Sequence, residues 1–279
     1  MGGWLTATLA MTVAGRELAT TLPVVVLMFF RAVFATVVLS VIVFGFRGGR
    51  PARTQRLPLH LVRNGVHYAA QYCWFWALAL IPMAQVISIE FTLPIWAAIL
   101  AVMFLGEKLN ARRIAAIALG FLGVLVIVRP GVVTTEFGHL VALAAALGFG
   151  ATVTMTKALT RTDEPLTVIF YMFAIQIVIG AVPTLLEWQT PQGAQWFWLA
   201  LVATAGTFSH FCLTKAMSLA DNTVILPMDF LRVPLTAIAG LALYGDPITP
   251  WLIAGATLIL AGNLLNLAPR RRAVDAADP

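Results

Sequence analysis

Residues 84–105 read AQVISIEFTLPIWAAILAVMFL, an apolar stretch that contains one carboxylate, Glu90. Its counterpart toward the C-terminal end, residues 222–243, reads NTVILPMDFLRVPLTAIAGLAL and holds Asp229 and Arg232. Both stretches are long enough to span a membrane. An ionisable side chain at bilayer depth is costly unless it meets a partner or water, so each of the three is a functional-site candidate.

The composition places the whole chain in the class of polytopic α-helical membrane proteins. Of the 279 residues, 60% are hydrophobic and only 11% are charged, whereas soluble proteins carry roughly 25% charged residues. The net charge of +6 comes from short basic loops between apolar stretches, which argues against a nucleic-acid partner. Cys73 and Cys212 are isolated within apolar stretches and form neither a disulfide framework nor a metal-ligand pattern.

Hydropathy predicts an all-α chain of about ten membrane spans. A helix needs about 20 apolar residues to cross a hydrocarbon core, and the first stretch is short by that measure. With both termini placed in the cytoplasm, the only basic loop residues outside are Arg16 and Arg129, as the positive-inside rule requires. The predicted spans are residues 3–14, 22–46, 59–81, 84–105, 111–128, 139–159, 166–186, 196–218, 222–243 and 251–268.

The two halves of the chain repeat. An offset of 139 residues pairs Glu90 with Asp229 and Gly123 with Gly262. Five spans in each half is an odd number, so the halves enter the membrane in opposite senses. Inverted repeats of this kind are an architecture of secondary transporters, whose substrate site lies near the midplane between the repeats.

These stretches resemble the drug/metabolite transporter superfamily, EamA type, over essentially the whole chain. The DFLR segment and the Arg31 segment FFRAVF also resemble a bacterial subgroup that includes S-adenosylmethionine-type transporters. The segments that carry the main resemblance are ALALIPMAQ (77–85), FTLPIWAAILAVMFLGEKL (91–109), LGFLGVLVIVRPG (119–131), LTKAMSLADNTVILPMDFLRVP (213–234) and GDPIT (245–249).

The resemblance implies two tandem five-helix domains, residues 1–130 and 139–269, followed by a cytoplasmic tail, residues 270–279. It also implies a bacterial inner membrane and no bound cofactor. Metabolite exporters, riboflavin importers and amino-acid exporters share the pattern, so the substrate does not follow from it. The chain departs from the subgroup at Glu90, where a small or apolar residue is usual, and at Asp246, where Glu is commoner.

Glu90 is the first candidate site residue. Pro94 lies four residues later and cannot donate a hydrogen bond to the Glu90 carbonyl, so a carboxylate, a free carbonyl and a kink coincide. This combination suits a proton or cation site in a cavity wall. The alternative is a static carboxylate paired with Arg31, which lies at bilayer depth in the second span and needs an acceptor. Arg31 is equally suited to a substrate anion.

Asp229 and Arg232 are spaced i, i+3 and share a helix face. They either neutralise each other or face a cavity, where Arg232 attracts a carboxylate and Asp229 an ammonium group. Pro227 and Pro234 flank the pair and each removes a backbone hydrogen bond. Broken backbone at membrane depth is tolerated only within protein or beside water.

The third span presents polar and aromatic side chains on one face: His67, Gln71 and Trp74 are spaced four and three residues apart. His210 holds a corresponding place in the eighth span. These side chains can line a cavity, although interface anchoring and neutral helix packing would also account for them.

The sequence therefore predicts a secondary transporter of small organic metabolites that works by alternating access, with proton coupling or exchange. Amino acids, nucleoside derivatives such as S-adenosylmethionine, and flavins are the substrate classes considered. The alternative is a non-transporting scaffold or regulatory subunit.

Enzyme and metal-site motifs are absent from the sequence. The expected partners are a small-molecule substrate and the lipid bilayer. Small residues such as Gly123 and Gly262 allow close helix approach, within the chain or in a homodimer.

Overall fold

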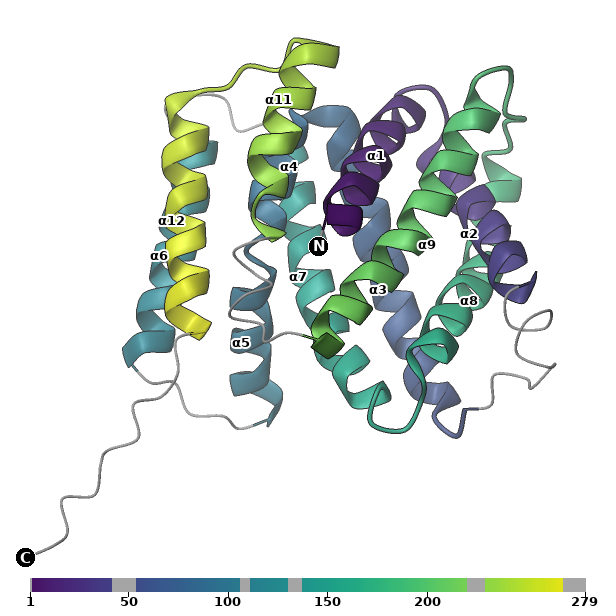
Figure 1. Cartoon of the computed structure of the whole chain (residues 1–279), viewed down its shortest axis with the longest axis horizontal. Helices are drawn as coiled ribbons and strands as arrows, with labels where there is room; N and C mark the ends of the chain where they lie inside the picture. The colour runs from purple at the N-terminus through teal and green to yellow at the C-terminus, as the bar shows by residue number, and fades with distance from the viewer. Residues whose placement is uncertain (1, 42–53, 106–110, 130–136, 220–228, 268–279) are drawn as a thin grey trace, which may run out of the picture.

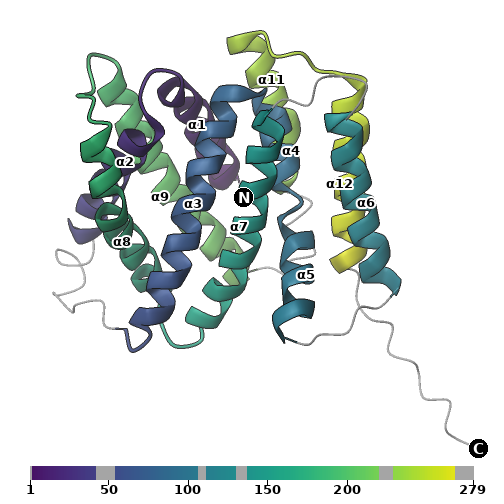
Figure 2. The same ribbon diagram turned by 180° about the vertical axis from the view of Figure 1, so that it is seen from behind.

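The computed structural model describes residues 2–41, 54–105, 111–129, 137–219 and 229–267, and within these ranges the regular structure is helical with no strand. Figures 1 and 2 show the helices standing side by side in a bundle. The predicted all-α membrane fold is confirmed. The helices are α1 (Gly2–Ala19), α2 (Val24–Ser40), α3 (Leu57–Leu80), α4 (Met83–Glu90), α5 (Leu93–Leu105), α6 (Ala111–Val128), α7 (Phe137–Leu159), α8 (Pro165–Leu186), α9 (Gln195–Leu219), α11 (Arg232–Tyr244) and α12 (Pro250–Leu267).

The predicted spans differ from the helices in the first span and within the fourth and ninth spans. The first span was expected to be short, but α1 continues to Ala19. Arg16 and Glu17 lower the mean hydropathy of this last turn without breaking the helix, which is why hydropathy ended the span too early. The fourth span is not one helix but two, α4 and α5. Pro227 and the first half of the ninth span lie outside the described residues.

The helix packing follows the internal repeat. Helix α1 packs against α9, and α7, which occupies the place of α1 in the second half, packs against α3. Helices α2 and α8 pack on each other, as do α6 and α12, and each of these pairs joins equivalent helices of the two halves. If the two halves are exchanged, the α1–α9 contact becomes the α7–α3 contact, and the α2–α8 and α6–α12 contacts map onto themselves. This is expected for two repeats related by an approximate two-fold axis.

The contact between α6 and α12 shows the same relation at the level of single residues. A Cβ added to Gly123 would lie 2.6 Å from the Gly255 carbonyl oxygen, and one added to Gly262 would lie 2.8 Å from that of Ala116. The offset of 139 residues converts the first contact into the second. The small residues predicted to allow close helix approach thus serve packing within the chain, where the two backbones meet directly.

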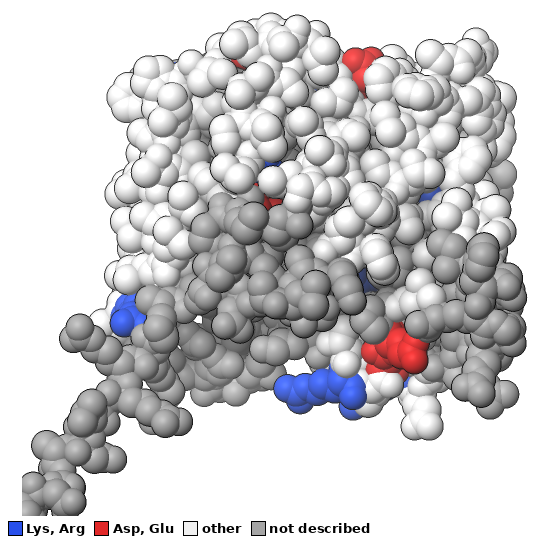
Figure 3. Space-filling model, in the orientation of Figure 1, with Lys and Arg blue, Asp and Glu red and all other residues white. Residues whose placement is uncertain are grey.

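The lateral surface of the bundle is apolar. Large side chains such as Val178, Leu185 and Leu186 on α8 are 70–82% exposed. In Figure 3 the largest coloured patches lie along the lower edge and at one place on the upper edge, and the described surface of the upper half is mostly white. Two helical stretches, Phe137–Thr156 and Leu166–Leu186, are each long and apolar enough to cross a membrane by themselves. Helices α4, α5 and α11 are shorter because the chain breaks beside them.

Candidate functional site

Two broken helices form the centre of the candidate site. Helix α4 ends at Glu90 and α5 begins at Leu93, after a two-residue turn. In the second half, the turn at residues 230–231 separates Asp229 from the start of α11 at Arg232. The two turns are 139 residues apart, so the chain breaks at equivalent places in both repeats.

The prolines lie just after these breaks. Pro94 is the second residue of α5 and Pro234 is the third residue of α11. In the first turn of a helix the backbone N–H has no intrahelical acceptor, so proline costs nothing there. Near Pro94 and Pro234 the chain makes a turn before the proline, and a new helix starts around each proline.

The two breaks touch each other. Phe91 and Phe230, which the repeat makes equivalent, lie with their ring centroids 5.0 Å apart. Equivalent residues of two repeats can be in contact only where the axis relating the repeats passes between or beside them. The breaks therefore meet at the interface between the two halves.

Arg232 joins the predicted charges into one network. Both terminal nitrogens of its guanidinium donate to Glu90 Oε1 at 3.1 Å, and Nη2 also donates to Asp229 Oδ2 at 3.3 Å. Its Nε lies 2.9 Å from Asp229 Oδ1. All three side chains are at most 15% exposed. With both carboxylates ionised, the trio carries one net negative charge.

Aromatic side chains hold this network in place. The indole N–H of Trp74 donates to Glu90 Oε2 at 2.7 Å, and the indole N–H of Trp4 donates to Asp229 Oδ1. The Arg232 guanidinium carbon lies 4.8 Å from the Phe91 ring centroid and 5.5 Å from that of Trp4. Each carboxylate therefore has one indole donor and the shared guanidinium, while the cation has an aromatic face on which to stack.

Trp4 was missed in the sequence, because no local pattern marks its role. A tryptophan in an apolar helix is usually a packing or interface residue. Trp4 is 6% exposed, however, and a buried indole N–H needs an acceptor. The available acceptor lies 225 residues away in the chain, a distance over which helical spacing carries no information.

The predicted pairing of Arg31 with Glu90 is wrong. Arg31, on α2, is 1% exposed, and its guanidinium carbon lies 5.2 Å from the Phe173 ring centroid and 5.8 Å from that of Phe75. None of its three side-chain nitrogens donates a hydrogen bond to a described residue. Depth in the membrane suggested the pair, but equal depth does not place two side chains side by side within the bundle.

The predicted polar face of α3 lies inside the bundle, where it makes three separate contacts. Trp74 binds Glu90, as described, and Gln71 accepts a hydrogen bond of 3.1 Å from Gln176 on α8. His67 is 6% exposed and lies against Phe149, with ring centroids 5.5 Å apart. Across from this face, His210 on α9 lies within electrostatic range of Arg31.

Two further polar clusters lie near opposite ends of the bundle. At the end of α1, Arg16 binds both oxygens of Asp246, and Asp246 Oδ2 also accepts the Met83 N–H at 3.2 Å. At the start of α3, His60 Nε2 lies 2.8 Å from Asp163 Oδ2. Each cluster connects the two halves of the chain. The sequence did not reveal either one, because their members are far apart along the chain.

Asp163 lies in the turn between α7 and α8. Desolvation works against its ionised form, but hydrogen bonds from His60, Thr54 and Thr162 outweigh this effect and lower the pKa of the Asp163 carboxyl. The carboxylate is therefore held in its charged form by fixed donors from both halves of the chain.

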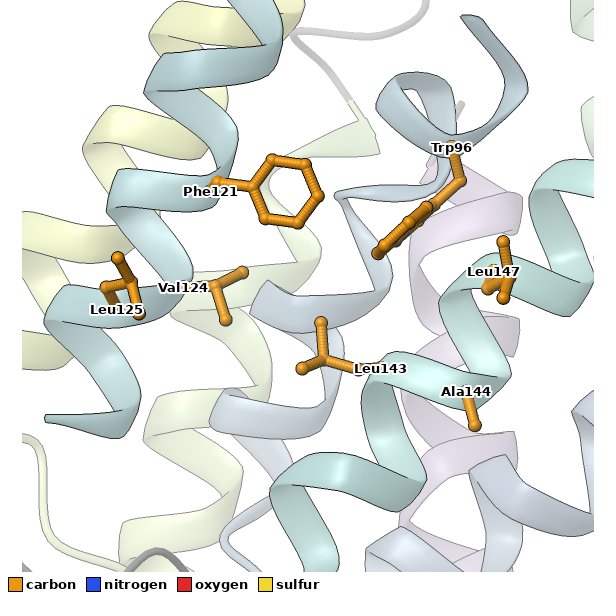
Figure 4. Close-up of a pocket in the computed structure, with 7 residues that line it drawn as sticks. All are labelled: Trp96, Phe121, Val124, Leu125, Leu143, Ala144 and Leu147. Atoms are coloured by element: carbon orange, nitrogen blue, oxygen red, sulfur yellow. The ribbon is translucent and has the colours of Figure 1, made fainter. Parts of the chain in front are cut away.

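One cavity in the described part of the chain lies apart from the charged network, between α5, α6 and α7 (Figure 4). Its volume is about 280 Å³, and its lining includes Trp96 and Phe121, whose rings stand edge to face. No predicted site residue lines it. An apolar crevice of this kind suits hydrocarbon and offers no group for recognising a charged solute. The remaining lining residues are Val124, Leu125, Leu143, Ala144 and Leu147.

Comparisons with known proteins agree with this architecture. An S-adenosylmethionine uptake transporter of Rickettsia felis is 26% identical over 98% of this chain and 94% of that protein. A riboflavin transporter of Brucella anthropi is 31% identical, covering 88% of each chain. A pseudopaline exporter of Pseudomonas aeruginosa is 24% identical over 88% of this chain and 86% of that protein.

The fold also matches a solved crystal structure over 99% of this chain and 97% of the other, with a TM-score of 0.68 at 18% identity. The family model for EamA-like transporters matches twice, at residues 5–129 and 136–268. The protein is thus a multi-pass membrane protein of a transporter type and not an enzyme. The chain belongs to the EamA-like transporter family.

Proposed function

We propose that this protein is a secondary transporter that moves a small organic metabolite across the bacterial inner membrane by alternating access. The observation that supports this most directly is the network of Glu90, Arg232 and Asp229, which joins the helix breaks of the two halves. Substrate and coupling-ion sites of transporters with inverted repeats form at such discontinuous helices.

The charge of the network suits coupling. One guanidinium shared by two carboxylates leaves one negative charge in a buried setting, and a buried net charge is unfavourable. A proton on either carboxylate, or a cationic group of the substrate beside it, would make the site neutral. Binding would therefore change the contacts that link the two halves, which is what a coupled or exchange mechanism requires.

The moving units in this proposal are the two repeats, residues 1–130 and 139–269, with both termini and the tail, residues 270–279, in the cytoplasm. The Arg16–Asp246 and His60–Asp163 clusters join the repeats near opposite ends of the bundle. Alternating access would open one of these connections while the other remains closed.

For the substrate we propose an amino acid, nucleoside derivative or flavin. The relatives are named as transporters of S-adenosylmethionine, riboflavin and pseudopaline, all of which are small organic metabolites. Aromatic side chains around the network, such as Trp4, Trp74 and Phe91, provide surfaces on which a flat or cationic group can stack. This family membership favours transport over the scaffold or regulatory alternative.

The test is uptake and counterflow in proteoliposomes with a panel of labelled metabolites of these classes. We expect Glu90→Gln and Asp229→Asn to lower the rate by about 10- to 100-fold, the value of a hydrogen bond to a charged group. Glu187→Gln, at an exposed carboxylate beyond α8, is the matched control and should keep the wild-type rate. Normal transport by both network variants, with normal membrane insertion, would disprove the role of this network.

A further inference from the structure

Arg31 is a buried cation for which the described chain provides no anion. Its side chain is 1% exposed, and its three nitrogens lack a hydrogen-bond acceptor among the described residues. Two aromatic rings, Phe75 and Phe173, contact the guanidinium from α3 and α8. Stacking on rings leaves the in-plane N–H groups free to bind another group.

A buried arginine without a hydrogen-bond acceptor is energetically unfavourable. The guanidinium keeps its charge inside proteins, so it cannot escape burial by losing a proton. An unpaired buried ion is strongly unfavourable, and replacing it with an apolar side chain is often neutral or stabilising. A packing role alone would therefore be met better by methionine or leucine, so Arg31 suits an acceptor that the described residues do not supply.

The surroundings of Arg31 add a second unpaired donor. Both ring nitrogens of His67 lack a hydrogen-bond partner within the described ranges, and His67 is 6% exposed. His67 and His210 both lie within electrostatic range of Arg31 and of Arg63. Arg63 itself binds neutral groups, the Thr156 hydroxyl at 3.1 Å and an amide oxygen. This part of the core is thus positively charged.

Arg31 also lies where the two halves face each other. The repeat makes Gly206 of α9 equivalent to His67 of α3. A Cβ added to Gly206 would lie 3.7 Å from Arg31 Nε, and His67 lies on the other helix within range of the same guanidinium. One of these equivalent positions thus contacts Arg31 and the other lies within its electrostatic range, as expected for a residue in a substrate site between repeats.

We propose that Arg31 binds the carboxylate of the transported substrate, with a neutral His67 ring N–H as a second donor. The planar guanidinium matches a carboxylate in a two-bond geometry. A single carboxylate would neutralise the Arg31 charge, since Arg63 has neutral partners of its own. This proposal rests on the proposed transport function and narrows its substrate class to carboxylic acids.

The rest of the site indicates the other end of that substrate. His67 lies two turns before Trp74, the residue that binds Glu90, and seven residues of helix correspond to about 10 Å. The Glu90 network carries one net negative charge and accommodates a cationic group. The substrate is therefore an elongated zwitterion, with its carboxylate at Arg31 and its cationic group toward Glu90 and Asp229.

The experiment measures binding by the full-length protein in lipid nanodiscs, using thermal stabilisation and radioligand titration. The probes are carboxylic-acid metabolites paired with matched compounds that lack the acid, including S-adenosylmethionine with its decarboxylated form. We expect the wild type to prefer at least one acid over its partner compound by about 10- to 100-fold. Arg31→Met should abolish this preference, and Arg31→Lys should retain part of it. Glu187→Gln, the control, should bind as the wild type does.

Three results would overturn the proposal: equal binding of acids and partner compounds, an unchanged preference in Arg31→Met, or binding of none of the acids at millimolar concentration. A preference for phosphate monoesters would overturn the carboxylate assignment. Because Arg31→Met removes an unpaired ion, it should fold with at least wild-type thermal stability. Acid binding without transport would remove the proposed function but keep this site, whereas transport with no preference for acids would do the reverse.

Discussion

Arg232 and Arg31 are both buried among aromatic rings in the interior of the bundle, but their polar partners differ completely. Arg232 has two carboxylates within 3.3 Å, each of which also accepts an indole N–H. Arg31 has no acceptor within the described part of the chain. The difference separates two uses of a membrane-buried cation. Arg232 neutralises charges of the protein itself and links its halves, whereas Arg31 has no anion among the described residues and, in our proposal, binds the charge of a substrate.

The largest expected effect is the difference in unfolding free energy between two single variants, each of which removes one of these arginines. Arg232→Met leaves Glu90 and Asp229 buried without their cation and should lower the free energy of unfolding by about 3–5 kcal/mol. Arg31→Met should leave it unchanged or raise it. The measurement is unfolding of each purified variant in the same detergent. Equal losses in the two variants would mean that Arg31 has an internal partner too, and the comparison would fail.

An intermediate effect is expected from the indole that orients Glu90. Trp74→Phe keeps the aromatic ring but removes the N–H donor, and a hydrogen bond to a charged group contributes about 1.5–3 kcal/mol. Transport in proteoliposomes should fall, and Trp74→Phe should add little to the loss already caused by Glu90→Gln. Trp76→Phe, two residues further along α3 and on roughly the opposite face of the helix, is the matched control. Fully additive losses in the double variant would show that the two side chains act independently.

The smallest effect concerns Asp163, a carboxylate that, like those beside Arg232, has fixed donors. Its pKa is lowered in the folded protein, so its contribution to stability is present above the pKa of the unfolded chain, about 4. That contribution is lost as the pH falls through the lower, folded-state pKa. Thermal unfolding from neutral pH to pH 3 should show a smaller pH dependence in Asp163→Asn than in the wild type. An identical slope in both proteins would contradict this.

The sequence predicted the features that depend on local pattern and on repetition. Apolar length gave the membrane class, the offset of 139 residues gave the equivalence of Glu90 and Asp229, and Pro94 and Pro234 marked the helix breaks. The i, i+3 spacing also placed Asp229 beside Arg232. Each of these inferences uses positions within one helix or a comparison of the two halves, and such relations are contained in the order of residues.

Lateral neighbours could not be predicted in this way. Hydropathy reports how deep a residue lies but not which helix stands beside it, so depth offered Arg31 as one possible partner of Glu90, whereas the structure pairs Glu90 with Arg232. Trp4 and the pair of Arg16 with Asp246 were missed for the same reason. In a bundle of many similar spans, the pairing of helices decides these contacts.

The glycine contact between α6 and α12 has a mechanical consequence. Where Gly123 meets Gly255, the two main chains touch without side chains between them, so no rotamer can change to let one helix slide along the other. In the proposed alternating access, we therefore expect α6 and α12 to move together as one rigid unit. The helices around Arg31 and Arg232 would then change position relative to α6 and α12, while the contact between α6 and α12 stays unchanged.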